Sequence, residues 1–459
     1  MSTPDHLDLL RRAADLAVAH EAAVDARPAT PSADAVAALT GFREPLPEDG
    51  VDPRDTLELL DALGGPATMA TTGPNYFGFV QGATYPVALA ASFLVDTWDQ
   101  NAALPMMSPV AAELYDVVRE WLVDVLGLAG HTDVAFVTGA TVANASGLAA
   151  ARDALLDERG WDVQRDGLFG APPIQVVIGE MAHSTLSKSL GMVGLGRERV
   201  VRVPADDQGR LRAELLPDLD PADGPILVCA QAGEVNTGAF DPFDVIADWV
   251  EARDGWLHVD GAFGLWALAD PTRAELVRGL GRADSLATDG HKWLNVTYDC
   301  GIVFVPRPGA LRRTFAAVAG YLPPDDRFEA MHHTPQSSQR ARQVEVWAVL
   351  RTLGRAGLAA MVQQSCAAAA AIADRLREEP GFEILNDVVL NQVLVRFRDG
   401  ATTEALVAAI QADGRIWCGP TQWAGGTALR VSVSSWKTTV DDAAAAAAVI
   451  VECAATLER

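Results

Sequence analysis

Two stretches of this 459-residue chain decide its fold: WLHVDGAFG (residues 256–264) and SLATDGHKWLNVTYDCG (residues 285–301). Each opens on a short, mostly apolar run, Trp256–Val259 in the first and Ser285–Thr288 in the second, and an aspartate follows each run at once. Short apolar runs of this kind are typical of strands buried on both faces of a parallel sheet. Both stretches are therefore predicted to be central strands with a polar carboxyl end.

Further apolar runs of the same length lie on either side of these two. They are Val134–Thr138, Ile174–Ile178, Val200–Val203, Ile226–Ala230 and Gly301–Val305. Helix-like segments such as 142–157 and 243–253 separate several of the runs. Strands that alternate with helices predict an α/β domain with a mostly parallel, seven-stranded sheet.

The ends of the chain have a different pattern. A long helix is expected over about 340–377, followed by strands at Gln392–Phe397 and Ala428–Val433 and a final Ala-rich helix, which together predict a smaller α+β domain. The amino-terminal part reads as helices, with Thr56 as the expected cap of one of them. We therefore expect three parts: an amino-terminal helical segment (1–95), a large α/β domain (96–340) and a small carboxy-terminal domain (341–459).

The composition excludes some classes of function. Lys and Arg number 36 and Asp and Glu 61, so the formal charge is −25. Nucleic acids and anionic membranes need positive charge to meet phosphate, so we expect neither as a partner. The five cysteines are scattered without a CxxC pair, which predicts reduced thiols and no zinc site. The start lacks a signal-peptide pattern, and we expect a cytoplasmic protein.

Groups with distinct chemistry follow the predicted strands, at the edge where ligands of parallel sheets bind. The turn Gly139-Ala140-Thr141 opens a helix and offers free N–H groups to a phosphate. Lys292 can form a Schiff base with an aldehyde, and Asp260 can keep a pyridine nitrogen protonated. His183 can stack on a ring or transfer protons. These four features together predict a pyridoxal 5'-phosphate (PLP) site.

The same segments resemble the group II PLP-dependent amino acid decarboxylases, which include aromatic amino acid, histidine and glutamate decarboxylases. The likeness rests on the 285–301 stretch and on HVDGAFGLWA (258–267) in family order, and it covers roughly residues 55–450. It extends through NYFGFVQGATYP (75–86), WDQNAALPMMSP (98–109), VTGATVANASGLAAARD (137–153), EMAHSTLSKS (180–189) and QAGEVNTGAFDPF (231–243). The resemblance implies fold type I and a homodimer whose site lies at the subunit interface, with the amino-terminal segment around the partner.

The resemblance also implies roles for matching positions. Lys292 would bind the aldehyde of PLP, Asp260 would pair with the pyridine nitrogen, and His183 would stack over the ring with Ala262 near its other face. Gly233 would lie in a small-residue loop near the cofactor. The residues that would hold the phosphate are Gly139, Ala140, Thr141 and His291.

The substrate is less readable. The resemblance places the substrate cleft along 75–86 and 98–108, together with the partner subunit. Arg430 resembles the family's carboxy-terminal arginine. The aromatic residues that would enclose an aromatic side chain are Tyr76, Phe77, Phe79 and Trp98, whereas a polar side chain would meet Gln81, Asp99 and Asn101. Aromatic or bulky L-amino acids are the favoured class.

Two departures from the family pattern bear on the product. Glu234-Val235 stands where the family has Thr-Thr or a similar pair, and the segment 322–340, which resembles the family's mobile loop, lacks the tyrosine that protonates the substrate carbon after carbon dioxide leaves. His332 and His333 fall near that place, and one of them is the hypothesised proton donor. The expected reaction is decarboxylation to an amine. Aldehyde-forming oxidative chemistry and carbon–carbon lysis are the alternatives.

Other functions fit the residues less well. His258, Asp260 and His291 imitate a two-His, one-carboxylate iron site, but such sites belong to all-β folds and leave Lys292 unexplained, so no metal is expected. Gly194 and Gly196 lack the third glycine of a dinucleotide-binding turn. A non-enzymatic binding protein would need neither Lys292 nor Asp260. The sequence therefore predicts a PLP-dependent amino acid decarboxylase.

Overall fold

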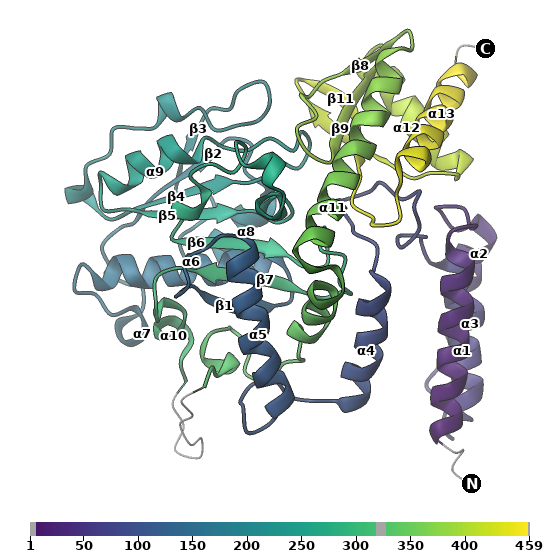
Figure 1. Ribbon diagram of the computed structural model, residues 1–459, viewed down its shortest axis with the longest axis horizontal. Helices are drawn as coiled ribbons and strands as arrows, with labels where there is room; N and C mark the ends of the chain where they lie inside the picture. Colours follow the sequence, from purple (N-terminus) through teal and green to yellow (C-terminus); the bar gives the residue numbers. More distant parts are fainter. Residues whose placement is uncertain (1–5, 318–326, 458–459) are drawn as a thin grey trace.

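The large domain is built on a seven-stranded sheet in the order β1-β7-β6-β5-β4-β2-β3 (Figure 1). The computed structural model describes residues 6–317 and 327–457. Strand β7 runs antiparallel to both neighbours, and the remaining pairs are parallel. The strands are β1 Asp133–Val137, β2 Gln175–Gly179, β3 Val200–Val203, β4 Ile226–Gln231, β5 Trp256–Asp260, β6 Ser285–Asp289 and β7 Gly301–Val305. All seven predicted strands are confirmed, with ends shifted by at most one residue.

Helices cover both faces of this sheet, because alternate strand residues point to opposite sides. Leu257 and Val259 of β5 belong to one hydrophobic core, and Trp256 belongs to the other. One face packs mainly against α5 (Pro109–Val125), α9 (Phe243–Glu251) and part of α11; the other packs against α6 (Ala140–Asp157), α8 (Ser184–Met192) and α10 (Ala310–Phe315). The short α7 (Val163–Asp166) follows α6. The expected α/β architecture is confirmed.

Helix α11 (Gln343–Arg377) connects the large domain to the small one (Figure 1). Its backbone leaves helical geometry at Gly354, where φ is 60° and ψ is −176°. By length and composition alone α11 is apolar enough to span a membrane, yet half of the apolar window is buried in the protein. Leu358 contributes to the core of the large domain and Ile372 to that of the small domain. Its apolar character is therefore explained by packing.

The small domain holds a four-stranded antiparallel sheet in the order β10-β11-β9-β8. Strands β9 (Gln392–Phe397) and β11 (Gly426–Ser432) were predicted, whereas β8 (Phe382–Ile384) and β10 (Gly419–Trp423) were not. Strand β8 has three residues, and β10 begins Gly-Pro, a pair that is tolerated in a strand only at a sheet edge. Helices α12 (Gly400–Asp413) and α13 (Val440–Thr456) complete the domain.

The amino-terminal helices α1 (His6–Val24), α2 (Ala33–Ala38) and α3 (Pro53–Gly64) form a projection beside the body, and α4 (Pro86–Trp98) packs on α11 (Figure 1). Asp52 caps α3 through Arg54 N–H, so the prediction of Thr56 as the cap is wrong. Lys437 Nζ ties the end of α1 to the small domain at 2.8 Å from Glu21. The domain boundaries proposed from the sequence stay a prediction.

Candidate active site

The predicted groups meet at the carboxyl edge of the parallel strands. Asp260 is the last residue of β5, Asp289 is the last residue of β6, and Gly139 follows β1 and precedes α6. Asp289 pairs with Gly301 of β7, whose own neighbour on the other side is Val137. The sheet register therefore brings the end of β6 and the start of α6 to the same place.

Asp289 is the hub of this edge, and no role for it was predicted. Its Oδ1 accepts a hydrogen bond from Ala140 N–H at 2.5 Å and lies 3.5 Å from His291 Nε2, and its Oδ2 lies 3.2 Å from Lys292 Nζ. The contact with Ala140 demonstrates that the first turn of α6 receives a negatively charged oxygen, as helix N-termini do. The available signal was its position, since Asp289 ends a buried strand just before His291 and Lys292.

His291 is held between Asp289 and the opposite wall. Its Nδ1 accepts a hydrogen bond from Cys300 N–H at 3.1 Å, and its ring lies against Tyr298 with ring centroids 4.2 Å apart. Burial lowers the pKa of His291, so the ring is neutral near pH 7. Tyr298 was not predicted; burial and the nearby charge of Asp289 raise its pKa.

Asp260 and His183 lie at the neighbouring part of the edge. Asp260 Oδ1 accepts a hydrogen bond from Ala262 N–H at 3.1 Å, and burial raises the pKa of the carboxyl while the charge of Lys292 and the hydrogen bond from Ala262 lower it. His183 begins α8, and its Nδ1 accepts a hydrogen bond from Thr185 N–H at 3.3 Å. Burial lowers the pKa of His183. The neutral ring therefore carries its proton on Nε2.

Two glycines allow close backbone contacts at this edge. A Cβ atom at Gly139 would lie 3.2 Å from His291 Cε1, so a side chain there would press on the histidine. Gly233 has a φ of 87°, and a Cβ atom added there would lie 3.1 Å from the Cα atom of Gly264. Thr141, also predicted to bind phosphate, lies in the first turn of α6, where its carbonyl accepts from Ser189 Oγ at 2.9 Å.

Aromatic side chains form a stack around the loop that contacts the lysine backbone. The ring of Trp417 lies 5.1 Å from Tyr76 and 5.1 Å from Phe79, and Trp417 was not predicted. Gly78 makes this packing feasible, because a Cβ there would lie 2.1 Å from the Trp417 ring. A Cβ at Gly82 would lie 1.8 Å from the carbonyl oxygen of Lys292, so the same loop rests on the lysine backbone.

Two of the predicted substrate residues do not belong to this stack. Phe77 is 1% exposed and packs in the core of the small domain, so its assignment to the substrate cleft is wrong. The side chain of Phe77 has a different environment from that of Phe79, because the chain turns at Phe79 and Val80, which have positive φ values of 55° and 57°. Trp98 ends α4, is 43% exposed, and makes no aromatic contact with other described residues.

Arg430 of β11 reaches the site from the small domain. It is half-buried, and its charge lowers the pKa of His183. One guanidinium N–H donates to Val235 O at 3.3 Å, and within the described chain its other N–H groups meet no acceptor. A half-buried guanidinium with unused donors can receive a carboxylate.

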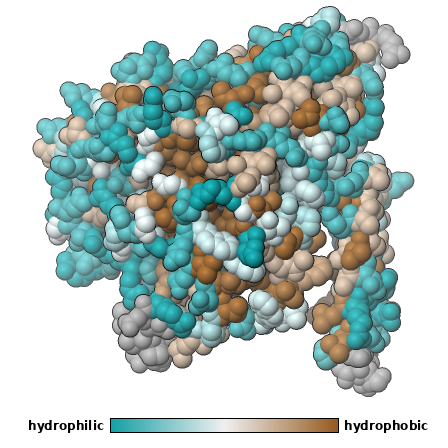
Figure 2. All heavy atoms as spheres, viewed as in Figure 1, coloured by the Kyte–Doolittle hydropathy of each residue, from teal (hydrophilic) through white to brown (hydrophobic). Residues whose placement is uncertain are grey.

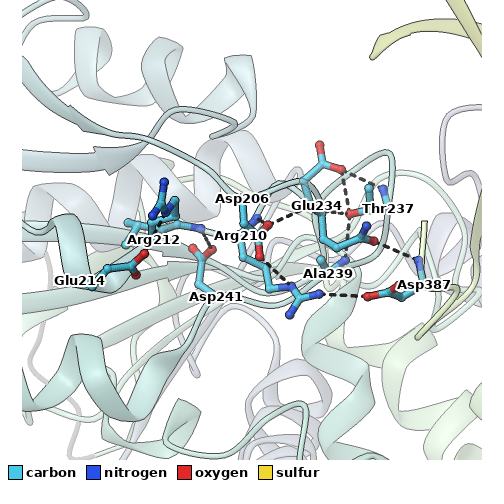
Figure 3. A network of polar contacts seen from close by, with 11 residues as sticks. Asp206, Arg210, Arg212, Glu214, Glu234, Thr237, Ala239, Asp241 and Asp387 are labelled. Carbon is cyan, nitrogen blue, oxygen red and sulfur yellow. Dashed lines mark hydrogen bonds and ion pairs between the residues drawn. The ribbon is translucent and has the colours of Figure 1, made fainter. Parts of the chain in front are cut away.

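The Glu234 departure has a structural explanation. Glu234 is buried, and its carboxylate accepts hydrogen bonds from Asn236 N–H at 2.7 Å and Thr237 N–H at 2.8 Å, so it closes its own turn. Figure 3 shows Glu234 and Thr237 in a polar network that reaches Arg210 and Asp387. Glu234 therefore stabilises its own turn, while Thr237 and Arg210 of the same network contact the small domain.

His332 and His333 lie at the opposite edge of the sheet, where the parallel strands begin. His332 Nδ1 accepts from Ala317 N–H at 3.2 Å, and His333 Nδ1 donates to Glu329 O at 2.9 Å. Among charged groups, Asp133 has the largest effect on the pKa of His333, and Asp133 begins β1 and pairs with the last residue of β7. No contact described for either histidine involves Lys292. Their assignment as proton donors to the site of their own chain is therefore a misplacement.

His258 is also unavailable for the iron-type arrangement considered above. Both of its ring nitrogens are engaged, Nδ1 with Ser285 Oγ at 2.8 Å and Nε2 with Asn144 Oδ1 at 2.9 Å. A histidine must present a free nitrogen lone pair to ligate a metal. This part of β5 therefore belongs to the protein interior.

Comparison with known proteins identifies the family. Residues 66–398 match the family model described as the pyridoxal-dependent decarboxylase conserved domain. The chain belongs to this family. It is accordingly a PLP-dependent decarboxylase, and the edge described above fits PLP: it offers an amine, a buried carboxylate and a helix N-terminus that already receives an anionic oxygen.

Relatives within the family differ in the substrates their names give. The chain is 25% identical over 407 residues to the aromatic-L-amino-acid decarboxylase of Bacillus atrophaeus, which covers 86% of this chain and 82% of that protein. It is 28% identical over 350 residues to the acidic amino acid decarboxylase GADL1 of Homo sapiens, covering 74% and 66%. The structure of Oryza sativa TDC with PLP and tryptamine superposes with a TM-score of 0.91 at 22% sequence identity, covering 99% of this chain and 98% of that chain. The structure of mouse CSAD superposes with a TM-score of 0.90 at 22% sequence identity, covering 99% of each chain.

Proposed function

We propose that this decarboxylase removes the α-carboxylate of an aromatic L-amino acid and releases the amine and carbon dioxide. The observation that carries the proposal is that Lys292, Asp260 and the first turn of α6 meet at one edge of the sheet, and that the loop carrying Tyr76 and Phe79, which stack with Trp417, rests on the Lys292 backbone. We assign Lys292 as the residue that binds the aldehyde of PLP and Asp260 as the partner of its pyridine nitrogen.

The residues of the site have separable tasks. PLP, when bound, supplies an electron sink for the bond that breaks as carbon dioxide leaves. Asp260 is buried and holds a proton at the ring nitrogen, and the neutral rings of His183 and His291 bring no further charge. The N-terminus of α6, from Gly139 to Thr141, receives the phosphate together with His291, and Ala262 and Gly233 leave room at the ring.

The substrate class follows from the walls. Tyr76, Phe79 and Trp417 present three aromatic rings, and burial raises the pKa of Tyr76 to about 12, so its hydroxyl stays neutral. Aromatic rings pack favourably on one another in offset arrangements. Arg430 is the cation for the α-carboxylate. An acidic side chain would need a second cation, and the described part of these walls supplies only Arg430.

Because neither His332 nor His333 contacts the Lys292 edge of its own chain, we assign the proton that replaces carbon dioxide to another group. The sequence carries a tyrosine, Tyr321, immediately before the 322–340 segment, and it lies outside the described residues. We propose Tyr321 as the donor. Tyr321 is the tyrosine nearest to that segment in the sequence.

The amino-terminal projection supports a homodimer. Leu7, Leu10, Leu59 and Leu60 are exposed on α1 and α3, and Figure 2 shows apolar patches among polar ones along this projection. Apolar faces on a projection gain free energy when a second copy covers them. We propose a dimer that shares its substrate clefts, with a cytoplasmic location and no nucleic-acid or membrane partner as further expectations. Its mass in solution, measured by light scattering, tests the dimer.

Product analysis tests the reaction. Purified protein with added PLP is given L-tryptophan, L-tyrosine, L-phenylalanine, L-glutamate, L-aspartate and cysteine sulfinate, and amine, aldehyde, peroxide and carbon dioxide are assayed together. Amine from the aromatic substrates supports the proposal, whereas aldehyde with peroxide, or amine only from the acidic ones, contradicts it. Trp417→Ala is expected to raise KM for aromatic substrates. Trp249→Ala, which removes a ring from α9 under Arg253, is the matched control.

A further inference from the structure

A continuous chain of buried hydrogen bonds lies behind Asp260, and the proposed reaction does not use it. Trp256 Nε1 donates to Ser285 Oγ at 2.8 Å, Ser285 Oγ bonds His258 Nδ1 at 2.8 Å, and His258 Nε2 bonds Asn144 Oδ1 at 2.9 Å. All four side chains are fully buried. Polar groups are expensive to bury, so a chain of this length inside a core calls for a purpose.

The secondary structure places these groups between the two parts of the site. Trp256, His258 and Asp260 are alternate residues of β5 and share one face of the sheet, and Ser285 of β6 is the register partner of His258. Asn144 lies one turn after Ala140 on α6, whose first turn is the proposed phosphate site. The chain of hydrogen bonds therefore connects the cofactor end of α6 to the strand that carries Asp260.

Gly147 keeps α6 close to the histidine. A Cβ at Gly147 would lie 3.0 Å from both Cε1 and Nδ1 of His258. A side chain at residue 147 would therefore force the imidazole or the helix to shift. Only glycine allows α6 to pack this closely against the ring of His258. The position of the ring is fixed by packing as well as by its hydrogen bonds.

The donors and acceptors in the chain point in one direction. An indole N–H only donates, so Ser285 Oγ accepts from Trp256 and has its own hydrogen for His258 Nδ1. Burial lowers the pKa of His258 to about 3, so the ring is neutral and its single N–H, on Nε2, is donated to Asn144 Oδ1. The Asn144 amide is thereby oriented with its oxygen toward His258 and its Nδ2 group away from it.

The Nδ2 group of Asn144 is the open end of the chain. It is buried and has no partner at hydrogen-bond geometry, and its interaction with Asp260 favours the ionised carboxylate. Burial alone would favour the protonated form of Asp260. An amide N–H group near the carboxylate opposes this effect, and an ionised carboxylate is the form that attracts a protonated pyridine nitrogen.

We propose that Trp256, Ser285 and His258 act as positioning residues that hold the Asn144 amide toward Asp260, and thereby keep Asp260 ready to bind the pyridine nitrogen. This inference rests on the proposed function, because Asp260 has its role there. The residues do not touch the cofactor. Their effect reaches it through Asp260, and it is confined to ligands whose ring carries a nitrogen.

The test compares two ligands that differ at one ring atom. Apoenzyme is titrated with PLP and with its carbocyclic analogue, in which a C–H group replaces the pyridine nitrogen, and both dissociation constants are measured by absorbance. Asn144→Ala is expected to weaken PLP about tenfold or more, the size of a hydrogen bond to a charged group, and to leave the analogue unchanged. Ser285→Ala removes the link between Trp256 and His258 and is expected to act in the same direction with a smaller loss.

Ser365→Ala is the matched control, since Ser365 is a buried serine on α11 whose Oγ donates to Met361 O at 3.2 Å. It is expected to change neither constant. Equal weakening of both ligands in Asn144→Ala and Ser285→Ala would overturn the proposal, because it would mean a general structural role. No weakening of PLP would also overturn it. A wild-type protein that binds no PLP would instead refute the proposed function from which this inference starts.

Discussion

Asp289 and Glu329 are buried carboxylates in nearly the same local arrangement, at opposite edges of the sheet. Asp289 lies 3.5 Å from His291 Nε2 and 3.2 Å from Lys292 Nζ. Glu329 lies 3.5 Å from His332 Nε2 and 3.1 Å from an Arg312 guanidinium nitrogen. Each acid is thus held between a histidine and a cation.

The surroundings separate the two arrangements. Asp289 also receives the first free N–H of α6, and Lys292 keeps about a fifth of its side chain exposed, so an incoming group can reach both. The backbone carbonyl of Glu329 accepts from His332 N–H and from His333, and its cation is an arginine, which forms no Schiff base. An acid, a histidine and a cation therefore define a site only where a helix N-terminus and an accessible amine accompany them.

The largest expected effect is that of Lys292→Ala. The variant loses the amine at the Asp289 edge and is expected to lose both the absorbance band of covalently bound PLP and all amine formation. Spectra of wild type and variant after PLP addition check this. Arg312→Ala at the other edge is the control and should keep the band. A band that survives in Lys292→Ala would assign the aldehyde-binding residue elsewhere.

Neutralising the two carboxylates compares the edges directly. Asp289→Asn is expected to lower kcat/KM about tenfold, because Lys292 Nζ loses its charged partner. Glu329→Gln is expected to leave kcat/KM unchanged and to lower the free energy of unfolding by about 1–3 kcal/mol, because Arg312 and His332 lose a buried charged partner. Kinetics and urea unfolding of both variants check this contrast. The reverse pattern would move the site to Glu329.

Two buried groups that lie at neither edge, His258 and Asp241, are expected to change the stability of the domain as the pH falls. Folded His258 has a pKa of about 3, so below pH of about 6.5 the unfolded chain binds a proton that the native state refuses, and stability falls by about 1.4 kcal/mol per pH unit. Burial raises the pKa of Asp241 to about 6, so the native state binds that proton first and stability rises as pH falls from about 6 to about 3.8. His258→Gln should flatten the acid loss and Asp241→Asn should steepen it, as measured by urea unfolding from pH 7 to 4.5.

The smallest effect on catalysis is expected at the second histidine pair. Replacing His332 and His333 together by phenylalanine should leave amine output unchanged, because neither side chain contacts the Lys292 edge, while stability falls by about 1–2 kcal/mol through lost buried hydrogen bonds. Amine assays and unfolding curves measure both. Tyr321→Phe is the paired variant and should abolish most amine formation; a loss in the histidine variant would restore those residues as proton donors.

The strands and the strand-end groups could be predicted because the relevant signals are local. Apolar runs mark β1 to β7, and Asp260 and Lys292 stand next to such runs in the sequence. Strands β8 and β10 lack that pattern, since they are short or lie at the edge of an antiparallel sheet. Their pairing depends on β9 and β11, which the local sequence does not report.

The missed parts of the site depend on contacts between distant segments. Trp417 meets Tyr76 and Phe79 only after the small domain has folded, and no spacing connects them. Phe77 and Phe79 are both aromatic and two residues apart, yet they go to different environments because of the positive φ at Phe79. Asp289 was visible in the sequence, but its role depends on the register that brings it to α6.

The contact of Gly82 with the Lys292 carbonyl has a consequence for engineering the substrate range. The loop that carries the aromatic stack and the segment that carries the reactive amine share one backbone interface, so a bulkier residue at Gly82 would displace the amine together with the wall, whereas one at Gly78 would displace the ring of Trp417. Libraries that vary the side chains of Phe79 and Trp417 leave this interface intact. Selectivity can therefore be redesigned in this fold by exchanging rings, whereas insertions or deletions in 76–82 would change the chemistry as well.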